Sequence, residues 1–212
     1  MKKPPRYGRY QDYVIRDGRL IGEFEEMYRD FDDPWEQTAR EADALDKTIG
    51  VELLKKYGHQ RPLEYGCGLG QYTARLYDEL GAAAGLDISD TAIAKARQRY
   101  SGPLFFVGDI LDQLPIRAFE PDSIVFAEIT WYVLESLAAF KEVSCQALRG
   151  KGFLHTLTTY PPGRQAYGAD YFKNLEEIMD YWSDVVDIKE WCIVSKKDGL
   201  GVSKSLFYGQ IK

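Results

Sequence analysis

The chain is poor in the residues that most metal and disulfide sites require. Its 212 residues include only three cysteines and two histidines. Cys67, Cys145 and Cys192 are odd in number and far apart, which argues against a disulfide framework and against a zinc site. His59 and His155 offer little material for a metal centre or a histidine-based triad. We therefore expect no bound metal, and we expect His155, in the middle of an apolar run, to be a hydrogen-bonded core residue.

Long apolar runs and an excess of basic charge are also missing. No apolar stretch is long enough to span a bilayer, and no apolar segment follows the initial Met-Lys-Lys-Pro-Pro. The formal net charge is -6, so an acidic surface would repel the phosphates of a nucleic acid. We expect a cytoplasmic monomer or homodimer whose partner is a small molecule rather than nucleic acid or a membrane.

The length and composition fit one structural domain with a sizeable core. Hydrophobic residues make up 45% of the chain and charged residues 28%, as in ordinary globular proteins. Residues 1–50 are rich in tyrosine and contain a hairpin signal at Asp17-Gly18. We interpret them as a cap over a ligand pocket, or as a strap on the surface of the main domain formed by residues 51–212. In this segment Asp33 and Pro34 are expected to start a helix that ends before Gly50.

Beyond this segment, short apolar strands alternate with helical patterns. This alternation predicts a parallel sheet with helices on both faces. Strands are expected near 62–65, 83–87, 104–107, 123–128 and 153–159, and helices near 70–80, 90–100 and 134–148. Two further β-like runs, 185–196 and 202–211, meet at a hairpin signal in residues 196–199. The expected fold is therefore α/β and Rossmann-like: a doubly wound, mostly parallel seven-stranded sheet with a C-terminal antiparallel hairpin and an N-terminal helical cap.

Residues 62–71, with the sequence PLEYGCGLGQ, are the most informative stretch. They predict a strand, a glycine-rich turn and the start of a helix, a combination that lets backbone approach a ligand closely. The turn differs from the dinucleotide fingerprint, because Gln71 stands where the third glycine should be and Gly70 falls one residue early. Glu64, just before the turn, would repel a pyrophosphate and suits a cationic or amine-bearing ligand.

Further acids end the next strands. Asp87 follows the turn by about 20 residues, where such folds place the carboxylate that accepts hydrogen bonds from ribose hydroxyls. Asp109 ends the third strand and Glu128 the fourth. Asp87 alone could cap a helix, and Asp109 alone could be a turn residue. Several strand-terminal acids in register with one glycine turn instead predict a ligand site at one edge of the sheet.

This ordered set of motifs resembles the class I S-adenosylmethionine (SAM) dependent methyltransferases over roughly residues 30–160. The resemblance implies SAM as cofactor and S-adenosylhomocysteine (SAH) as product. It assigns the methionine part of SAM to the glycine turn, the ribose to Asp87 and the adenine to Asp109 and Ile110. The expected cofactor-binding residues are Glu64, Gly66, Cys67, Gly68, Gly70, Tyr72, Asp87, Ile88, Asp109, Ile110 and Glu128.

Residues of the fourth motif and of later loops are the candidates for binding the acceptor. Glu128 and Tyr132 are the catalytic candidates: Glu128 could accept a proton, bind an amine or merely contact the amino group of SAM. An aromatic face at Tyr132 could stabilise a methyl cation or simply pack in the core. The expected substrate-binding residues are Tyr28, Trp35, Trp131, Tyr160, Arg164, Tyr167 and Tyr171.

The fourth motif also bears on the type of acceptor. Methyltransferases that act on nucleobase or glutamine amino groups carry Asn/Asp-Pro-Pro-Tyr here, whereas this chain reads Ala127-Glu128-Ile129-Thr130. The Ala-Glu…Tyr pattern, and the Asp32–Trp35 patch, resemble the small N-methyltransferases of the NodS type. We therefore predict methyl transfer to a small molecule or sugar derivative, with an amine favoured. The alternatives are an oxygen or carbon acceptor, a SAM-binding module without catalysis, or a nicotinamide-dependent dehydrogenase.

Overall fold

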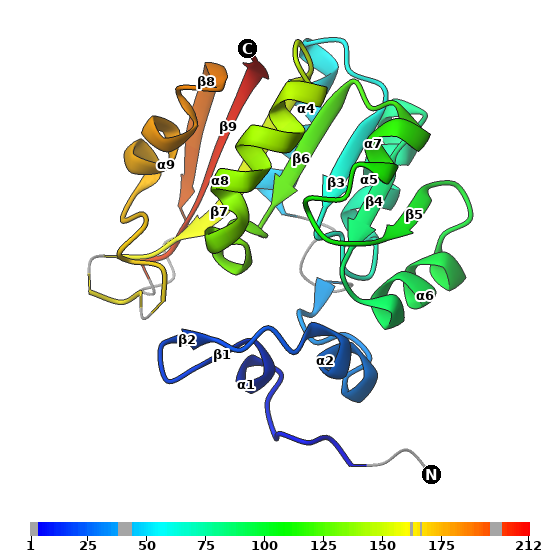
Figure 1. Cartoon of the computed structure of the whole chain (residues 1–212), viewed down its shortest axis with the longest axis vertical. Helices are drawn as coiled ribbons and strands as arrows, with labels where there is room; N and C mark the ends of the chain where they lie inside the picture. The colour runs from blue at the N-terminus through cyan, green and yellow to red at the C-terminus, as the bar shows by residue number, and fades with distance from the viewer. Residues whose placement is uncertain (1–3, 38–43, 162, 166, 196–200) are drawn as a thin grey trace.

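The computed structural model describes residues 4–37, 44–161, 163–165, 167–195 and 201–212, and its centre is a seven-stranded sheet (Figure 1). The strand order is β5-β4-β3-β6-β7-β9-β8. Strands β3 to β7 pair in parallel, and β9 runs antiparallel to both β7 and β8. The strands are β3 (Pro62–Tyr65), β4 (Ala84–Asp87), β5 (Leu104–Val107), β6 (Ser123–Ala127), β7 (Gly152–Thr159), β8 (Val186–Ser195) and β9 (Ser203–Ile211). The predicted fold class is confirmed.

Helices cover both faces of this sheet (Figure 1). They are α4 (Leu45–Lys56), α5 (Gln71–Leu80), α6 (Asp90–Arg99), α7 (Leu114–Phe119), α8 (Leu137–Phe140) and α9 (Leu175–Trp182). The helix expected over residues 134–148 is divided, because two 3-10 turns, η1 (Thr130–Tyr132) and η2 (Leu134–Ser136), precede α8 and a π-helical turn, η3 (Lys141–Cys145), follows it. None of the helices in the described ranges combines the length and the apolar composition that a bilayer-spanning segment needs.

The central strand β6 shows how the two layers of the core are built. Ile124 and Phe126 are fully buried against α8 and α9, whereas Val125 and Ala127 are buried on the other face against α4 and α5. Successive side chains of a strand point to opposite faces, so a strand covered on both sides must be apolar throughout. This explains why β6 reads as an unbroken apolar run rather than as an alternating one.

The prediction that a helix ends before Gly50 is wrong. Helix α4 runs through Gly50 without a break. A Cβ at this position would lie 2.7 Å from the Tyr72 hydroxyl and 2.9 Å from a Leu154 methyl group, distances that real Cβ atoms do not tolerate. Glycine therefore serves close packing of α4 on α5 and β7 here, and it does not act as a stop signal.

The prediction that Asp33 and Pro34 open a helix is also wrong for the described residues. The backbone turns at Glu36, whose φ of +53° is incompatible with an α-helix. The Asp33 carboxylate accepts a hydrogen bond from the Gln37 amide at 2.9 Å, which closes the turn. The rest of the expected helix falls partly on residues 38–43, which lie outside the described residues.

The N-terminal segment forms a small unit of its own at one end of the molecule (blue in Figure 1). It contains α1 (Gln11–Val14), the two-stranded hairpin β1 (Ile15–Arg16) and β2 (Arg19–Leu20), and α2 (Phe24–Asp30). Asp17 and Gly18 both have positive φ, as the favoured two-residue hairpin turn requires, so the predicted hairpin is confirmed. The other predicted hairpin loop, residues 196–199, lies outside the described residues, although β8 and β9 pair as expected.

Candidate active site

Three carboxylates meet at one edge of the sheet. Glu64 lies near the end of β3, Asp87 ends β4, and Asp109 follows β5. These strands are parallel neighbours, so their carboxyl ends share an edge, and that is where ligands bind in open α/β sheets. All three acids line a single cavity of about 980 Å³. The convergence expected from the sequence is therefore present in the structure.

The glycine-rich turn between β3 and α5 forms part of the same wall. Gly66 has a φ of +69°, and a Cβ there would lie 2.5 Å from the Ile129 side chain. Gly68 has a φ of +54°, and its amide donates a hydrogen bond to Asp87 Oδ2 at 2.8 Å. A side chain at Gly68 would also meet the Tyr28 hydroxyl. Only residues without a side chain fit both positions, since positive φ and close contact act together.

Asp87 is held rigidly in this wall. Oδ1 accepts a hydrogen bond from the Ser89 amide at 2.9 Å, while Oδ2 takes the Gly68 amide. Burial raises the pKa of Asp87 to about 6, because the two amide hydrogen bonds only partly offset the loss of hydration and Glu25 adds like charge nearby. The carboxyl group is thus placed to accept hydrogen bonds from a ligand, and it is fully ionised only above about pH 6.

Glu64 and Asp109 are anchored in different ways. Glu64 is 3% exposed and accepts a hydrogen bond from the Thr73 hydroxyl at the start of α5. Asp109 Oδ1 accepts from the Leu111 amide at 3.0 Å, and its own amide donates to Asp112. Of the predicted cofactor-binding residues, those that line the cavity are Glu64, Gly66, Asp87, Ile88, Asp109, Ile110 and Glu128.

The remaining predicted cofactor residues, Cys67, Gly68, Gly70 and Tyr72, do not line the cavity. Cys67 packs with Phe105 and the α6 residues beneath the turn, and burial raises the pKa of its thiol well above the ordinary value. Tyr72 is buried on the other side of the turn, where its hydroxyl donates to the backbone oxygen of Lys47 at 3.2 Å. These residues support the turn from the side that faces away from the cavity.

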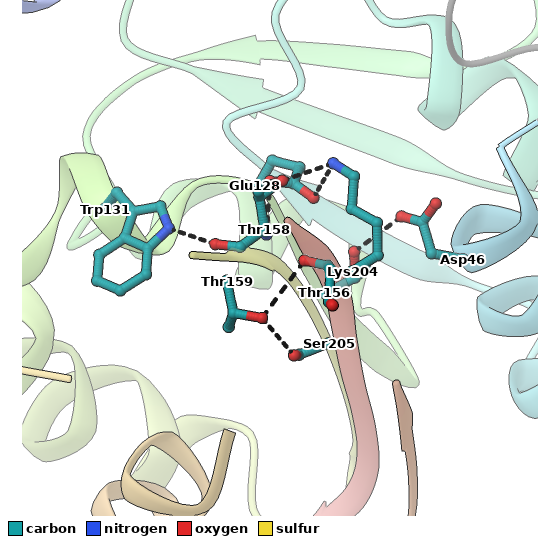
Figure 2. Close-up of polar contacts among 9 residues, drawn as sticks. Asp46, Glu128, Trp131, Thr156, Thr158, Thr159, Lys204 and Ser205 are labelled. Carbon is teal, nitrogen blue, oxygen red and sulfur yellow. Dashed lines mark hydrogen bonds and ion pairs between the residues drawn. The ribbon is translucent and has the colours of Figure 1, made fainter. Parts of the chain in front are cut away.

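Glu128 forms the centre of a second polar cluster in the cavity wall (Figure 2). Its Oε2 accepts hydrogen bonds from the Thr158 amide at 2.9 Å and the Thr158 hydroxyl at 2.8 Å. Its Oε1 accepts from Lys204 Nζ at 2.6 Å. Burial alone would raise its pKa, but the positive charges of Lys204 and Lys47 and these hydrogen bonds outweigh it, so the pKa lies below its ordinary value. Glu128 is thus an ionised carboxylate in a fixed position, and its φ of +65° adds local backbone strain.

Aromatic side chains close the cavity from the N-terminal side. The Tyr132 ring lies 5.6 Å from the Trp35 ring and 5.7 Å from the Phe24 ring, measured between centroids. Tyr28 and Tyr160 line the same cavity. Burial raises the pKa of both Tyr28 and Tyr132 above the ordinary value, so both phenols stay neutral near pH 7. Among the predicted acceptor-side residues, Tyr28, Trp35, Glu128, Tyr132 and Tyr160 therefore meet in one place.

The other four predicted substrate residues, Trp131, Arg164, Tyr167 and Tyr171, do not line this cavity. Trp131 is buried in the core on the α9 side, and its indole N–H donates to the Thr158 backbone oxygen at 2.9 Å. Tyr132 follows Trp131 in the same 3-10 turn but faces the cavity, because neighbouring side chains of such a turn diverge. Tyr171 lies on the surface, 49% exposed.

Several residues that line the cavity are not marked by any motif in the sequence. Asp46 and Lys47, each 3% exposed, lie in the first turn of α4, and Asp46 accepts a hydrogen bond from the Thr156 hydroxyl at 3.2 Å. Thr158 on β7 and Lys204 on β9 also line the cavity without such a motif. Further examples are Tyr10, Phe24 and Gln37 from the N-terminal segment. For Asp46 and Lys47, the only local feature that could have indicated the site is a pair of opposite charges at the start of a helix. Such pairs are also common on solvent-exposed helices.

His155 behaves as expected from its place in the sequence. It is fully buried in β7, and its Nε2 lies 2.7 Å from the Thr130 hydroxyl. Its ring stacks on Phe207, and burial lowers its pKa to about 3. Because this neutral ring does not line the cavity, it is not placed to act as a base there.

A family comparison agrees with this geometry. Residues 63–156, from β3 to the middle of β7, match the family described as the methyltransferase domain. The match covers 94 of the 212 residues, and it shows that this part of the chain is similar to a methyltransferase domain. This similarity implies SAM as the methyl donor. The matched range contains the glycine turn, Asp87, Asp109 and Glu128, while Lys204 and the N-terminal aromatic residues lie outside it.

Solved structures share the fold of this chain. The N-methyltransferase NodS from Bradyrhizobium japonicum WM9, in complex with SAH, is similar with a TM-score of 0.66 and 19% identity, over 85% of this chain and 93% of that one. The magnesium protoporphyrin IX methyltransferase ChlM from Synechocystis PCC 6803, with bound SAM, is similar with a TM-score of 0.58 and 14% identity, over 96% and 90% of the two chains. A comparison with curated protein sequences gave no match.

Proposed function

We propose that this protein is a SAM-dependent methyltransferase that transfers the methyl group to an amine nitrogen of a small molecule or sugar derivative. The observation that carries the proposal is Glu128: an ionised carboxylate, fixed by three hydrogen bonds, in the cavity wall. Tyr132 and Trp35 line the cavity with it. A carboxylate beside aromatic faces favours an amine, since both groups attract N–H and positive charge.

The carboxylates and the glycine turn that line the cofactor half of the cavity suit the polar groups of SAM. In our assignment, Asp87 accepts hydrogen bonds from the ribose hydroxyls, and Asp109 with Ile110 contacts the adenine. Glu64 and the backbone at Gly66 hold the methionine part, whose amino group is a partner for a carboxylate. The buried carboxylates and the glycine turn, which a Cβ would block, support this assignment. Bound SAM supplies a methyl group activated by its sulfonium, and the bond to sulfur breaks as the nucleophile's lone pair attacks.

Residues of the chain then act mainly by orientation. The Oε1 atom of Glu128 accepts one hydrogen bond in the described structure and can accept another from an acceptor N–H. Tyr132, Trp35 and Tyr28 cover the site and exclude water, which keeps the nucleophile and the methyl carbon in line. In this proposal residues 1–50 are the cap of the site and residues 51–212 the catalytic domain.

The protonation states of the site favour an amine over an alcohol. Alcohol acceptors need a base to remove a proton, and the lowered pKa of Glu128 makes it a weak base. No histidine is among the described residues that line the cavity. An amine has a neutral fraction with a free lone pair and can release its proton to water. Methylation of nitrogen therefore does not require a strong base in the cavity wall, whereas methylation of an alcohol does.

The test combines acceptor screening with one variant. Incubating the protein with labelled SAM and matched sets of amines, alcohols and carboxylic acids should give methylated amines, seen by mass spectrometry. Glu128→Gln should lower kcat/KM for the amine about ten-fold to a hundred-fold, the range for a lost charge-assisted hydrogen bond, while SAH affinity changes little. The exposed Glu135, which does not line the cavity, provides the control Glu135→Gln. Methyl transfer only to oxygen or carbon would refute the proposal.

A further inference from the structure

Lys204 carries a hydrogen-bond donor that no described protein atom uses. Its Nζ donates to Glu128 Oε1 at 2.6 Å and to the Thr158 hydroxyl at 2.7 Å (Figure 2). A lysine ammonium has three N–H donors, so one remains. The side chain is 40% exposed and lines the cavity. The remaining donor is thus available to a ligand, and the two bonds already made hold the ammonium in place.

The position of Lys204 in the sheet assigns it to the acceptor and not to the nucleoside. It lies near the start of β9 and pairs with Thr158 of β7. In the strand order β3-β6-β7-β9, it is three strands away from Glu64, or about 14 Å along the sheet edge at the usual strand spacing. Asp87 and Asp109 lie farther still, on β4 and after β5. A group that contacts Lys204 therefore extends away from the ribose and adenine.

The charges around Lys204 restrict the kind of group that fits. Lys47, buried in the wall, lies with its Nζ 4.4 Å from the centroid of the Tyr72 ring, and it adds a second ammonium. Asp46 and Glu128 are the two carboxylates of this part of the wall. Two positive and two negative groups balance, so a ligand with one charge of each sign preserves neutrality. A dianion such as a phosphate would instead leave an excess of negative charge in this part of the cavity.

We infer that Lys204 is a specificity-determining residue that binds a carboxylate on the acceptor, which makes the acceptor an amine that also carries a carboxylate group. This inference rests on the proposed amine methylation. Glu128 and Lys204 are hydrogen-bonded to each other, so the unused acceptor position of the carboxylate and the unused donor of the ammonium lie side by side. Such a pair matches an ammonium or amine and a carboxylate separated by few bonds, as in an amino acid. The transfer itself is unchanged: the N–C bond forms, the C–S bond breaks, and the nitrogen loses a proton to water.

The experiment compares amino acids with the amines that lack their carboxylate. Tryptophan with tryptamine and tyrosine with tyramine are suitable pairs, tested for turnover and for binding to the SAH-loaded protein by calorimetry. The wild type should favour the carboxylate member of a pair by about ten-fold or more, the effect of one charge-assisted hydrogen bond. Lys204→Met should abolish this preference by raising KM for the amino acid, and Lys204→Arg should retain most of it. Lys189→Met, on the surface of β8 outside the cavity, is the matched control.

Four other outcomes would contradict the inference, and the measurements distinguish them from one another. If no amino acid of the panel binds the SAH-loaded protein better than its amine, Lys204 does not select for a carboxylate. If amines are methylated without this preference, amine methylation stands and the role of Lys204 is wrong. If Lys204→Met weakens SAH binding itself, the ammonium serves the methionine part of the cofactor instead. If the acceptors found are not amines, the proposed function fails as well.

Discussion

Glu25 of α2 and Thr91 of α6 are joined by two hydrogen bonds across 66 residues of sequence. The Thr91 hydroxyl donates to Oε1 at 2.6 Å and the Thr91 amide donates to Oε2 at 3.0 Å. Oε2 also accepts from the Ser89 hydroxyl at 2.6 Å. A carboxylate at a helix N-terminus satisfies free amides and interacts favourably with the helix dipole. Glu25 thereby fixes the N-terminal segment to the strand end that carries Asp87.

This contact predicts that Glu25→Gln loosens the N-terminal segment. The free energy of unfolding should fall by about 1 kcal/mol, the usual effect of losing a helix cap, and trypsin should cut the first 35 or so residues faster. The neighbouring Glu26, also in the first turn of α2, provides the control Glu26→Gln.

The same contact should make stability depend on pH. Burial opposes ionisation of Glu25, but the hydrogen bonds from Ser89 and Thr91 outweigh burial, so the pKa of Glu25 is lowered. The stabilisation should therefore be present above about pH 4.5 and disappear as the pH falls below it.

SAM binding should depend strongly on Asp87. Replacing it with alanine removes the acceptor that we assign to the ribose hydroxyls, and each lost hydrogen bond to a polar ligand group costs about 1–3 kcal/mol. Calorimetric titration with SAH should show this loss for Asp87→Ala and no loss for Asp78→Ala, an exposed acid on α5. An unchanged SAH dissociation constant in the first variant would remove this assignment.

The protonation of Asp87 should leave a signature in the pH dependence of stability. Its pKa rises from 3.8 to about 6 in the folded protein, mainly through burial. The folded state therefore binds this proton more tightly than the unfolded chain, and the contribution to stability is lost as the pH rises through about 6. In denaturant unfolding without ligand, Asp87→Asn should gain stability relative to the wild type between pH 4 and 7. A difference that is independent of pH would contradict the raised pKa.

The two glycines that flank α5 offer a matched pair of substitutions. Gly70 and Gly81 both have positive φ, of +78° and +91°. A Cβ at Gly70 would lie 2.7 Å from the Phe105 ring, whereas nothing lies within 4 Å of one at Gly81. Gly81→Ala should cost only the backbone strain of about 1 kcal/mol, and Gly70→Ala a further 1–3 kcal/mol from overpacking. Equal losses in denaturant unfolding would show that space around Gly70 is not limiting.

The strands and the strand-terminal acids were predictable because they depend on local patterns. The run at 62–65 and the run at 104–107 match β3 and β5 to the residue. A buried parallel strand is a short apolar run, and polar residues at or near its carboxyl end mark where it stops. Parallel pairing then places such ends on one edge, so the amino-acid pattern is sufficient to assign Glu64, Asp87 and Asp109 to one site.

The acceptor half could not be predicted to the same extent. Lys204 reaches Glu128 only because β9 runs antiparallel to β7, which sets Lys204 beside Thr158. Asp46 and Lys47 look like surface residues of a helix until α4 packs against β7 and β9. Trp131 and Tyr132 are adjacent and chemically alike, yet one is in the core and the other in the cavity wall. Gly50 reads as a helix stop, and only the approach of Tyr72 and Leu154 reveals its packing role.

By itself the sequence determined the order of strands and helices along the chain, the glycine turn and the acids at or near the strand ends. These features are set by neighbours in the chain, through backbone propensity and the period of apolar residues. Tertiary structure alone decided the ion pair between Lys204 and Glu128, the direction of Tyr132 and the docking of Glu25 on α6. Those contacts join residues far apart in the sequence, and their geometry depends on how strands pair and helices pack, which no local pattern encodes.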